Sequence, residues 1–296
     1  MPVVPALRTE HLTKRYGRVL ALDSLDLEVP AGQVFGFLGP NGAGKSTTIR
    51  LLLGLARPTS GRAWVLGAPA ADVAAAHAHL AHVPADVALW PALTGAETLE
   101  LLARIGPGTD LALRDELVER FDLDPSKPGR TYSTGNRQKV ALVAAFATRA
   151  PVLVLDEPTS GLDPLMERQF RLAVAQARDR GRTVFLSSHQ LGEVEAVCDR
   201  VAILRTGRLV EIADVTDLRG LHRTEVVAEI RGPVPDLARV PGVSAVVADG
   251  GKVRFDLVGP PTPALRALAV ADVVSLQMRE PTLEEIFLGY YGGARR

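Results

Sequence analysis

The chain has 296 residues, with 34 basic side chains (Lys and Arg) and 34 acidic ones (Asp and Glu), so its formal net charge is zero. This balance gives no electrostatic reason to expect binding to nucleic acid or to an anionic membrane surface. The single cysteine, Cys198, excludes an internal disulfide framework and fits a reducing compartment. The length can hold one large and one small domain, which we place at residues 1–220 and 221–296.

The beginning of the chain predicts antiparallel strands, because apolar and polar residues alternate between Leu7 and Val29. The apolar run Val34–Leu38 then predicts a buried strand. No basic stretch followed by an apolar run precedes these strands, so we expect no signal peptide. No segment of the sequence approaches the roughly 20 apolar residues of a membrane span.

The loop after this buried strand matches the pattern G-x-x-x-x-G-K-[ST] at every fixed position. Its glycines let backbone N–H groups converge where a Cβ would crowd a phosphate, and the positive end of a helix expected over Lys45–Leu55 faces the same anion. Lys45 can reach the terminal phosphates, and Ser46 can offer its hydroxyl to Mg²⁺. The alternative is a glycine-rich turn that merely precedes a helix. The expected phosphate-binding residues are Gly39, Pro40, Asn41, Gly42, Ala43, Gly44, Lys45, Ser46 and Thr47.

The section that follows predicts mostly helix. We expect a strand over Arg62–Gly67, an alanine-rich helix over Ala70–Leu80 and a helical section over Leu93–Phe121 that breaks at Gly106–Gly108. Three histidines in H-x-H-x-x-H spacing lie here, but no fourth ligand is nearby, so we interpret them as exposed or packed side chains rather than as a zinc site. They are His77, His79 and His82.

From residue 138 onwards helices alternate with strands, which predicts a parallel sheet covered by helices. The expected elements are helix Gln138–Thr148, strand Val152–Pro158, helix Pro164–Arg180, strand Thr183–Ser188, helix Leu191–Cys198, strand Val201–Gly207 and a linker over Asp214–Leu221. Beside a phosphate loop, Asp156 at a strand end is positioned to hold Mg²⁺, and Glu157 to take a proton from an attacking water. An ordinary exposed strand end with two acids is the alternative.

The last part of the chain predicts a small α+β domain. Its best local signal is Asp249-Gly250-Gly251, a tight turn inside a hairpin over Val243–Val258. The element order resembles a split β-α-β-β-α-β unit. The other expected elements are strands Thr224–Ile230 and Val273–Met278, a weak helix near Leu237, a helix near Ala264–Leu268 and a terminal helix with Thr282 and Glu285 in a capping box.

Four motifs in this order resemble those of the ATPase subunit of an ATP-binding cassette transporter. They are GPNGAGKST at Gly39–Thr47, YSTGNRQK at Tyr132–Lys139, LVLDEPTSGLDP at Leu153–Pro164 and LSSH ending in His189. The resemblance covers about Leu7 to Glu211. It implies an α/β fold of the P-loop NTPase type, with a mainly parallel core sheet, an antiparallel β subdomain and a helical subdomain, to which the small C-terminal α+β domain is added.

The resemblance also implies roles for residues outside the phosphate loop. Ser133 and Gly135 match the signature motif, which meets ATP held by the opposite subunit, although this chain has YSTGN where the family usually has LSGGQ. His189 matches the residue that contacts the γ-phosphate, and Tyr16 matches the aromatic residue that stacks on adenine. The segment Ser160–Asp163 matches the loop that crosses the dimer interface. Plain packing is the alternative for Tyr16.

One position departs from the family. Ala85 stands where the family has a glutamine, and its side chain can neither coordinate Mg²⁺ nor form a hydrogen bond. We favour the neighbouring Asp86 as the replacement over a purely structural role for that carboxylate.

The sequence therefore predicts a subunit that hydrolyses ATP with Mg²⁺ and drives a membrane permease formed by another chain. We expect it to lie peripherally at the cytoplasmic face of the cell membrane, to work as a homodimer or heterodimer, and to bind no nucleic acid. The signature region and the chain end resemble bacterial drug and antibiotic exporters of the daunorubicin or polyketide type, which favours export. A non-transport ATPase of the same family in a soluble complex is the alternative. A P-loop GTPase would be expected to show an N-K-x-D motif, which the sequence lacks.

Overall fold

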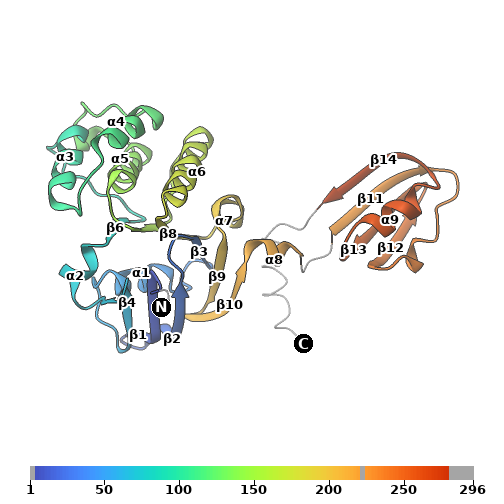
Figure 1. The fold of residues 1–296 in the computed structure, drawn as a ribbon, viewed down its shortest axis with the longest axis horizontal. Helices are drawn as coiled ribbons and strands as arrows, with labels where there is room; N and C mark the ends of the chain where they lie inside the picture. Colours follow the sequence, from blue (N-terminus) through green and yellow to red (C-terminus); the bar gives the residue numbers. More distant parts are fainter. Residues whose placement is uncertain (1–3, 221–223, 280–296) are drawn as a thin grey trace. The chain divides into compact units, whose positions relative to one another are not determined.

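The computed structural model describes residues 4–220 and 224–279, and the chain divides into two compact units, Met1–Ile212 and Ala213–Arg296 (Figure 1). The first unit is built on a six-stranded sheet of order β10-β9-β3-β8-β7-β6. Its strands are β3 (Val34–Leu38), β6 (Leu80–Val83), β7 (Val152–Asp156), β8 (Thr183–Ser188), β9 (Arg200–Arg205) and β10 (Arg208–Asp214). The central strands pair in parallel, and every residue of β3, β7 and β8 is buried. The α/β fold with a mainly parallel core sheet is therefore confirmed.

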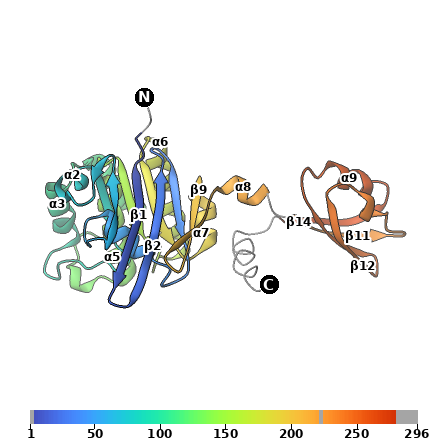
Figure 2. The ribbon, with the colours of Figure 1, turned by 90° about the horizontal axis from the view of Figure 1, so that it is seen from below.

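A second, antiparallel sheet of order β2-β1-β4-β5 completes the core of this unit. Its strands are β1 (Leu7–Tyr16), β2 (Val19–Val29), β4 (Ser60–Val65) and β5 (Ala68–Pro69), and Figure 2 shows β1 and β2 side by side. The inward side chains of this sheet share one apolar cluster with Phe35 and Phe37 of β3 and with Ile49 of helix α1 (Lys45–Leu52). Burial of these side chains joins both sheets around α1.

The helical section lies at the opposite end of the first unit from β1 and β2 (Figure 1). It contains α3 (Gly95–Ile105), α4 (Leu111–Arg120), the short 3₁₀-helix Gly129–Thr131 and α5 (Thr134–Ala147). A reciprocal capping box between Thr94 and Glu97 starts α3, and Gly106 ends it, so the predicted helical section and its break are both present. The longer helix α6 (Pro164–Asp179) begins with Asp163 as its N-cap.

Several element boundaries differ from the predictions. Helix α1 ends at Leu52 rather than Leu55, because Gly54 turns the chain with a φ of 66°. Helix α2 spans only Val73–His77, because Leu80 already belongs to the buried strand β6. Strand β4 starts at Ser60, before the predicted Arg62. Helix α5 starts before the predicted Gln138, because the Ser133 hydroxyl caps it.

The strand β10 was not predicted, and the segment predicted as a linker contains helix α8 (Val215–Gly220). Helix α7 (Leu191–Val197) and strand β9 match their predicted positions, with the buried Cys198 between them. Burial raises the pKa of the Cys198 thiol well above its ordinary value, so this side chain is an apolar packing group rather than a nucleophile.

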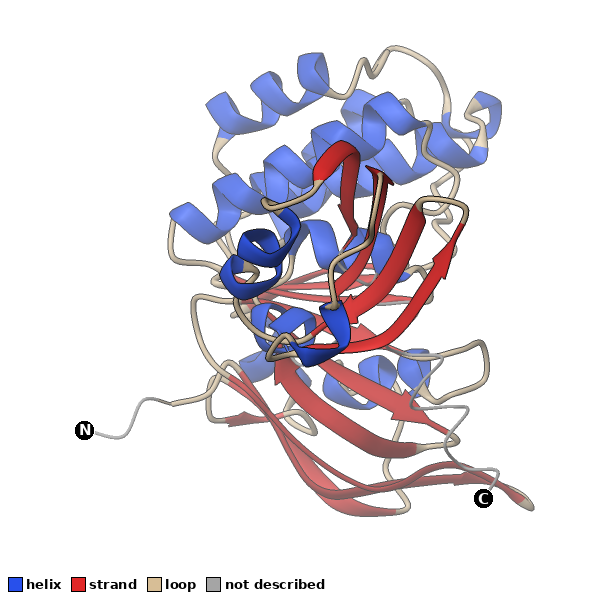
Figure 3. Ribbon diagram, turned by 90° about the vertical axis from the view of Figure 1, so that its right-hand side faces the viewer, coloured by secondary structure: helices blue, strands red, loops and turns tan. Residues whose placement is uncertain are grey.

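The second unit is a four-stranded sheet of order β12-β13-β11-β14, with antiparallel pairing throughout. The strands are β11 (Thr224–Arg231), β12 (Val243–Asp249), β13 (Lys252–Leu257) and β14 (Asp272–Arg279). Figure 3 shows helices in blue beside the red strands of the sheets. In helix α9 (Thr262–Leu268), Ala264 and Leu268 are buried in the same apolar cluster as side chains of β11 and β13. The helix predicted near Leu237 is a short 3₁₀ turn, Leu237–Arg239. The predicted capping box at Thr282 and Glu285 lies outside the described residues.

Arg182 ties the end of α5 to the start of β8. Its buried guanidinium donates hydrogen bonds to Ala150 O (2.9 Å), Phe146 O (2.7 Å), Ala145 O (3.3 Å) and Thr148 Oγ1 (3.3 Å). The carbonyls at the end of a helix are favourable partners for a cation. Burial disfavours the charged form of Arg182 and lowers its pKa to about 10, and these carbonyls stabilise the guanidinium cation in that buried position.

We expect Arg182→Met to lower the free energy of unfolding of this unit by roughly 2–4 kcal/mol, because it leaves several buried carbonyls without donors. Urea unfolding followed by circular dichroism measures the change. Arg171→Met, at an exposed position on α6, is the matched control and should shift stability by less than about 0.5 kcal/mol. Equal shifts in the two variants would contradict the role given to Arg182.

Candidate nucleotide site

The phosphate loop joins the end of β3 to the start of α1. Gly44 has a φ of 109°, and a Cβ there would lie 2.7 Å from Ala21 O, so only glycine fits this close approach. Lys45 is buried, and its Nζ donates to Gly39 O over 2.7 Å. The loop therefore holds its ammonium group at the N-terminal end of α1, where an anion is favoured.

A cavity of about 500 Å³ opens over this loop. Residues from four separate parts of the chain line it: Tyr16 from β1, the loop with Lys45, Glu157 after β7, and His189 after β8. In the sequence, only their motifs linked these residues to one site. The lining is Tyr16, Ala21, Pro40, Asn41, Gly42, Gly44, Lys45, Ser46, Thr47, Ala85, Glu157, Ser160 and His189. The carboxyl ends of neighbouring parallel strands meet at one edge of a sheet, which explains why these side chains converge. Gly39 and Ala43 support the loop without lining the cavity.

Glu157 is the polar centre of the cavity. Its Oε1 lies 3.2 Å from Lys45 Nζ, and its Oε2 lies 2.7 Å from His189 Nδ1. Its backbone has a φ of 49°, in the left-handed region that non-glycine residues seldom adopt, and its N–H donates to Ser187 Oγ over 3.1 Å. The protein thus fixes a carboxylate between an ammonium group and an imidazole.

Asp156 precedes Glu157 and is buried at the end of β7. It accepts a 2.5 Å hydrogen bond from Ser187 Oγ, so Ser187 supports both acids, a contact that the sequence motifs did not reveal. Ser46, in the first turn of α1, is half-buried and lines the cavity. A hydroxyl and a carboxylate are the hard oxygen donors that Mg²⁺ prefers, so the residues present fit this ion.

The signature residues do not line the cavity of their own chain. Ser133 is exposed and caps α5, with its Oγ accepting from Asn136 N over 3.3 Å. Gly135 lies against the loop after β7, where a Cβ would be 2.5 Å from Gly161 O. The structure therefore presents Ser133 and the N-terminus of α5 away from Lys45 and Glu157.

The position of the family glutamine lies at the wall of the cavity. Ala85 is exposed and lines the cavity. The neighbouring Asp86 is also exposed, but it does not line the cavity and makes no hydrogen bond or ion pair within the described part of the chain. The loop is instead held through its backbone: Val87 O accepts from Arg137 Nε over 3.2 Å. Arg137 and the buried Gln138, which donates to Pro158 O over 2.9 Å, are site-supporting residues that sequence reasoning missed. Their position directly after the signature residues was the only signal.

Two of the three histidines of the H-x-H-x-x-H run contact separate parts of the backbone. His77 Nε2 lies 2.8 Å from Leu53 O, and His82 Nδ1 lies 2.9 Å from Val154 O. Burial lowers the pKa of His82. Over residues 4–220 and 224–279, no group of three or more side chains with metal-binding chemistry comes together.

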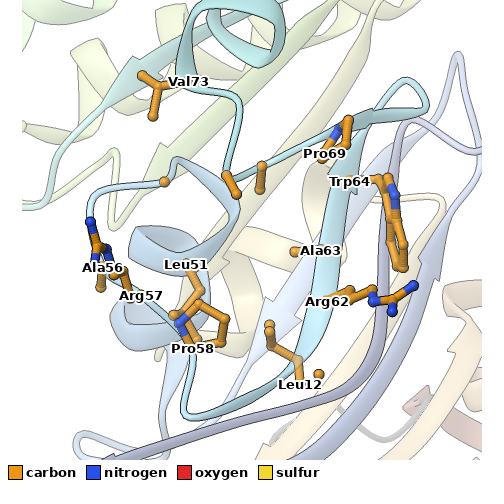
Figure 4. Close-up of a pocket in the computed structure, with 14 residues that line it drawn as sticks. Leu12, Leu51, Ala56, Arg57, Pro58, Arg62, Ala63, Trp64, Pro69 and Val73 are labelled. Atoms are coloured by element: carbon orange, nitrogen blue, oxygen red, sulfur yellow. The ribbon is translucent and has the colours of Figure 1, made fainter.

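A second cavity, of about 580 Å³, lies between the end of α1 and strands β4 and β5 (Figure 4). Its walls include Leu51, Pro58 and Trp64, with Arg57 and Arg62 among the few polar groups. None of its lining residues carries a carboxylate, an imidazole or a hydroxyl, so this cavity offers no group for acid–base chemistry.

Comparison with known proteins shows the family to which this chain belongs. The ABC transporter family model matches residues 22–160. The daunorubicin resistance ATP-binding protein DrrA3 of Streptomyces coeruleorubidus is 35% identical over 98% of this chain and 97% of that protein. The daunorubicin/doxorubicin resistance ATP-binding protein DrrA of Streptomyces peucetius is 32% identical over 97% of this chain and 92% of that protein.

A solved structure described as an ATP binding subunit of an ABC transporter superposes with a TM-score of 0.67 at 31% identity, covering 72% of this chain and 92% of that one. The similarity of sequence over nearly the whole length of two curated relatives, together with this fold, is sufficient to assign the family. The chain belongs to the family of ATP-hydrolysing, ATP-binding subunits of ABC transporters.

Proposed function

We propose that this chain powers the export of a drug-like or antibiotic-like molecule through a separate membrane permease. One observation carries the proposal: Lys45, Glu157 and His189 line the same cavity, and Ser133 does not line it. This arrangement is expected for an ATP site that is completed by Ser133 of a second subunit. The direction and cargo class are supported by the two daunorubicin resistance relatives, whose similarity extends through the second unit.

In this proposal the triphosphate of ATP lies over the phosphate loop. Lys45 is buried and paired with Glu157, so the phosphates would compete with that carboxylate for its ammonium group. Tyr16 is about half exposed at the cavity rim, with Lys14 Nζ 4.8 Å from its ring centroid, and its ring would stack on adenine. Ser46 and Asp156 would hold Mg²⁺, which neutralises phosphate charge.

Glu157 accepts a proton from water as the water oxygen attacks the γ-phosphorus and the bond to the β–γ bridging oxygen breaks, giving ADP and inorganic phosphate. His189 orients the Glu157 carboxylate and contacts the γ-phosphate. Ser133 and the backbone N–H of Gly135 approach the γ-phosphate from the partner subunit, at the N-terminus of its α5. Each working unit is therefore a dimer, either of two copies or of a mixed pair.

The permease belongs to another polypeptide in this proposal. None of the helices among the described residues has the length and apolar character of a membrane-crossing segment. We place the chain peripherally at the cytoplasmic face of the cell membrane, with the region from Trp90 to Phe121 toward the permease. Trp90 and Ile105 expose large apolar side chains there, as a docking surface requires.

Transport by purified components tests this function. We expect proteoliposomes that contain the chain and the permease that co-purifies with it from membranes to move daunorubicin in an ATP-dependent manner, with the ATPase rate rising when drug is present. Lys45→Ala should abolish both while leaving the complex assembled. Full ATP hydrolysis without any drug movement or drug response would remove the export proposal and leave the ATPase in place.

A further inference from the structure

A single arginine links two parts of the protein that face different ATP molecules. Arg137, half-buried in the first turns of α5, donates from Nε to Val87 O (3.2 Å), from Nη1 to Tyr132 O (3.1 Å) and from Nη2 to Thr134 Oγ1 (3.1 Å). The first of these acceptors belongs to the loop formed by residues 84–90, which we call the 84–90 loop. The other two belong to residues 132–135, which we call the signature turn.

The 84–90 loop forms part of the chain's own cavity, because Ala85 lines it. The signature turn lines no part of that cavity and, under the proposed function, completes the site of the partner subunit. Two neighbouring residues of α5 contact the opposite wall: Gln138 Nε2 donates to Pro158 O, directly after Glu157, and Gly135 packs against Gly161. Of these contacts, only those of Arg137 reach the 84–90 loop.

The chemistry of the side chain suits this task. A guanidinium is a planar fork with five donors, so it can serve three acceptors that lie in different directions at once. The two acceptors on Val87 and Tyr132 are backbone carbonyls of buried residues, which keeps the geometry fixed by the fold rather than by mobile side chains. Lysine, with one compact ammonium on a flexible stem, cannot hold the same three positions.

We propose that Arg137 is a positioning residue that couples the two ATP sites of the dimer. It holds the wall of a chain's own ATP cavity in register with the signature turn that the same chain presents to its partner's ATP. In this chain the coupling runs through the Val87 carbonyl and Arg137, and it does not require a side chain at Ala85. The proposal rests on the composite site of the proposed function.

The test uses mixed dimers with one competent site. A dimer of one Lys45→Ala chain and one Ser133→Arg chain has a single intact site. Its P-loop comes from the Ser133→Arg chain, and its signature turn comes from the Lys45→Ala chain. Arg137→Met is then placed on either chain in turn. A coupling residue acts at both of its ends, so we expect ATP turnover to fall roughly tenfold in both arrangements, with ATP affinity of the separate chains unchanged.

Two results would overturn the proposal. A loss of turnover in only one arrangement means that Arg137 supports one wall alone, and a loss in neither means that it has no positioning role.

Arg130→Met is the matched control. Arg130 is exposed near the same turn, and its side chain makes no hydrogen bond or ion pair within the described residues. Arg137→Lys should recover less than half of the lost turnover. The mixed dimer without any Arg137 change reports on the composite site alone, so failure of the proposed function is seen separately.

Discussion

Replacing Glu157 with glutamine is expected to lower kcat for ATP hydrolysis by at least roughly a hundredfold while ATP still binds. Glutamine has the size of glutamate and keeps an oxygen that can face Lys45, but it cannot accept a proton from water. The contacts of Glu157 with Lys45 Nζ (3.2 Å) and His189 Nδ1 (2.7 Å) show how closely this carboxylate is fixed. Single-turnover hydrolysis and equilibrium ATP binding, measured on the same variant, separate chemistry from affinity.

The Glu157→Gln variant should also accumulate as an ATP-bound dimer, because the nucleotide that joins two chains is no longer hydrolysed. Size-exclusion chromatography with and without ATP detects this species. Glu119→Gln, the same substitution at an exposed position on α4, is the control and should leave turnover and dimerisation unchanged. Wild-type turnover in Glu157→Gln would mean that another group accepts the proton.

The second large effect is expected at Ser133. Ser133→Arg places a long charged side chain at the exposed N-cap of α5, where the γ-phosphate of a partner-bound ATP would lie. We expect ATP turnover to fall at least roughly tenfold while the ATP affinity of the isolated chain stays within about twofold, because Ser133 lines no part of its own cavity. Steady-state kinetics and titration with a fluorescent ATP analogue measure the two quantities. A parallel loss of affinity would place Ser133 in its own subunit's site.

The central part of the fold was predictable because its signals are local and strong. The buried run Val34–Leu38 followed by a glycine loop and Lys45 specifies strand, turn and helix in order, and the apolar strand ending in Asp156 and Glu157 is equally explicit. Parallel strands then bring their carboxyl ends to one edge, so the convergence of Lys45, Glu157 and His189 follows from the element order.

The helix boundaries were less predictable because tertiary contacts override local preference. The alanines after Ala70 favour helix, yet the chain leaves the helix at His77 so that Leu80 and Val83 can be buried in β6. Thr134 and Asn136 are weak helix formers, yet α5 includes them because Ser133 caps its first turn.

The contacts that support the site could not be predicted, because they join distant parts of the sequence. The bond from Arg137 to Val87 O spans 50 residues, and the bond from Ser187 to Asp156 spans 31. Both partners of each pair belong to recognisable stretches, but nothing in those stretches shows that they meet. Strand β10 was missed for a related reason: its residues are only partly buried at the edge of the sheet, so their apolar signal is weak.

The most direct test of the composite ATP site is the ATPase rate of mixed, individually inactive chains. The Lys45→Ala chain has an intact signature turn and the Ser133→Arg chain an intact P-loop, so a mixed dimer contains one complete site while each homodimer contains none. We predict that mixing the two at equal concentration restores ATP turnover to about a quarter of the wild-type rate per chain. With random pairing about half of the dimers are mixed, and each mixed dimer has one intact site where the wild type has two. Turnover that remains at the level of the separate variants, with mixed dimers demonstrated by differential tags, would contradict a site shared between subunits.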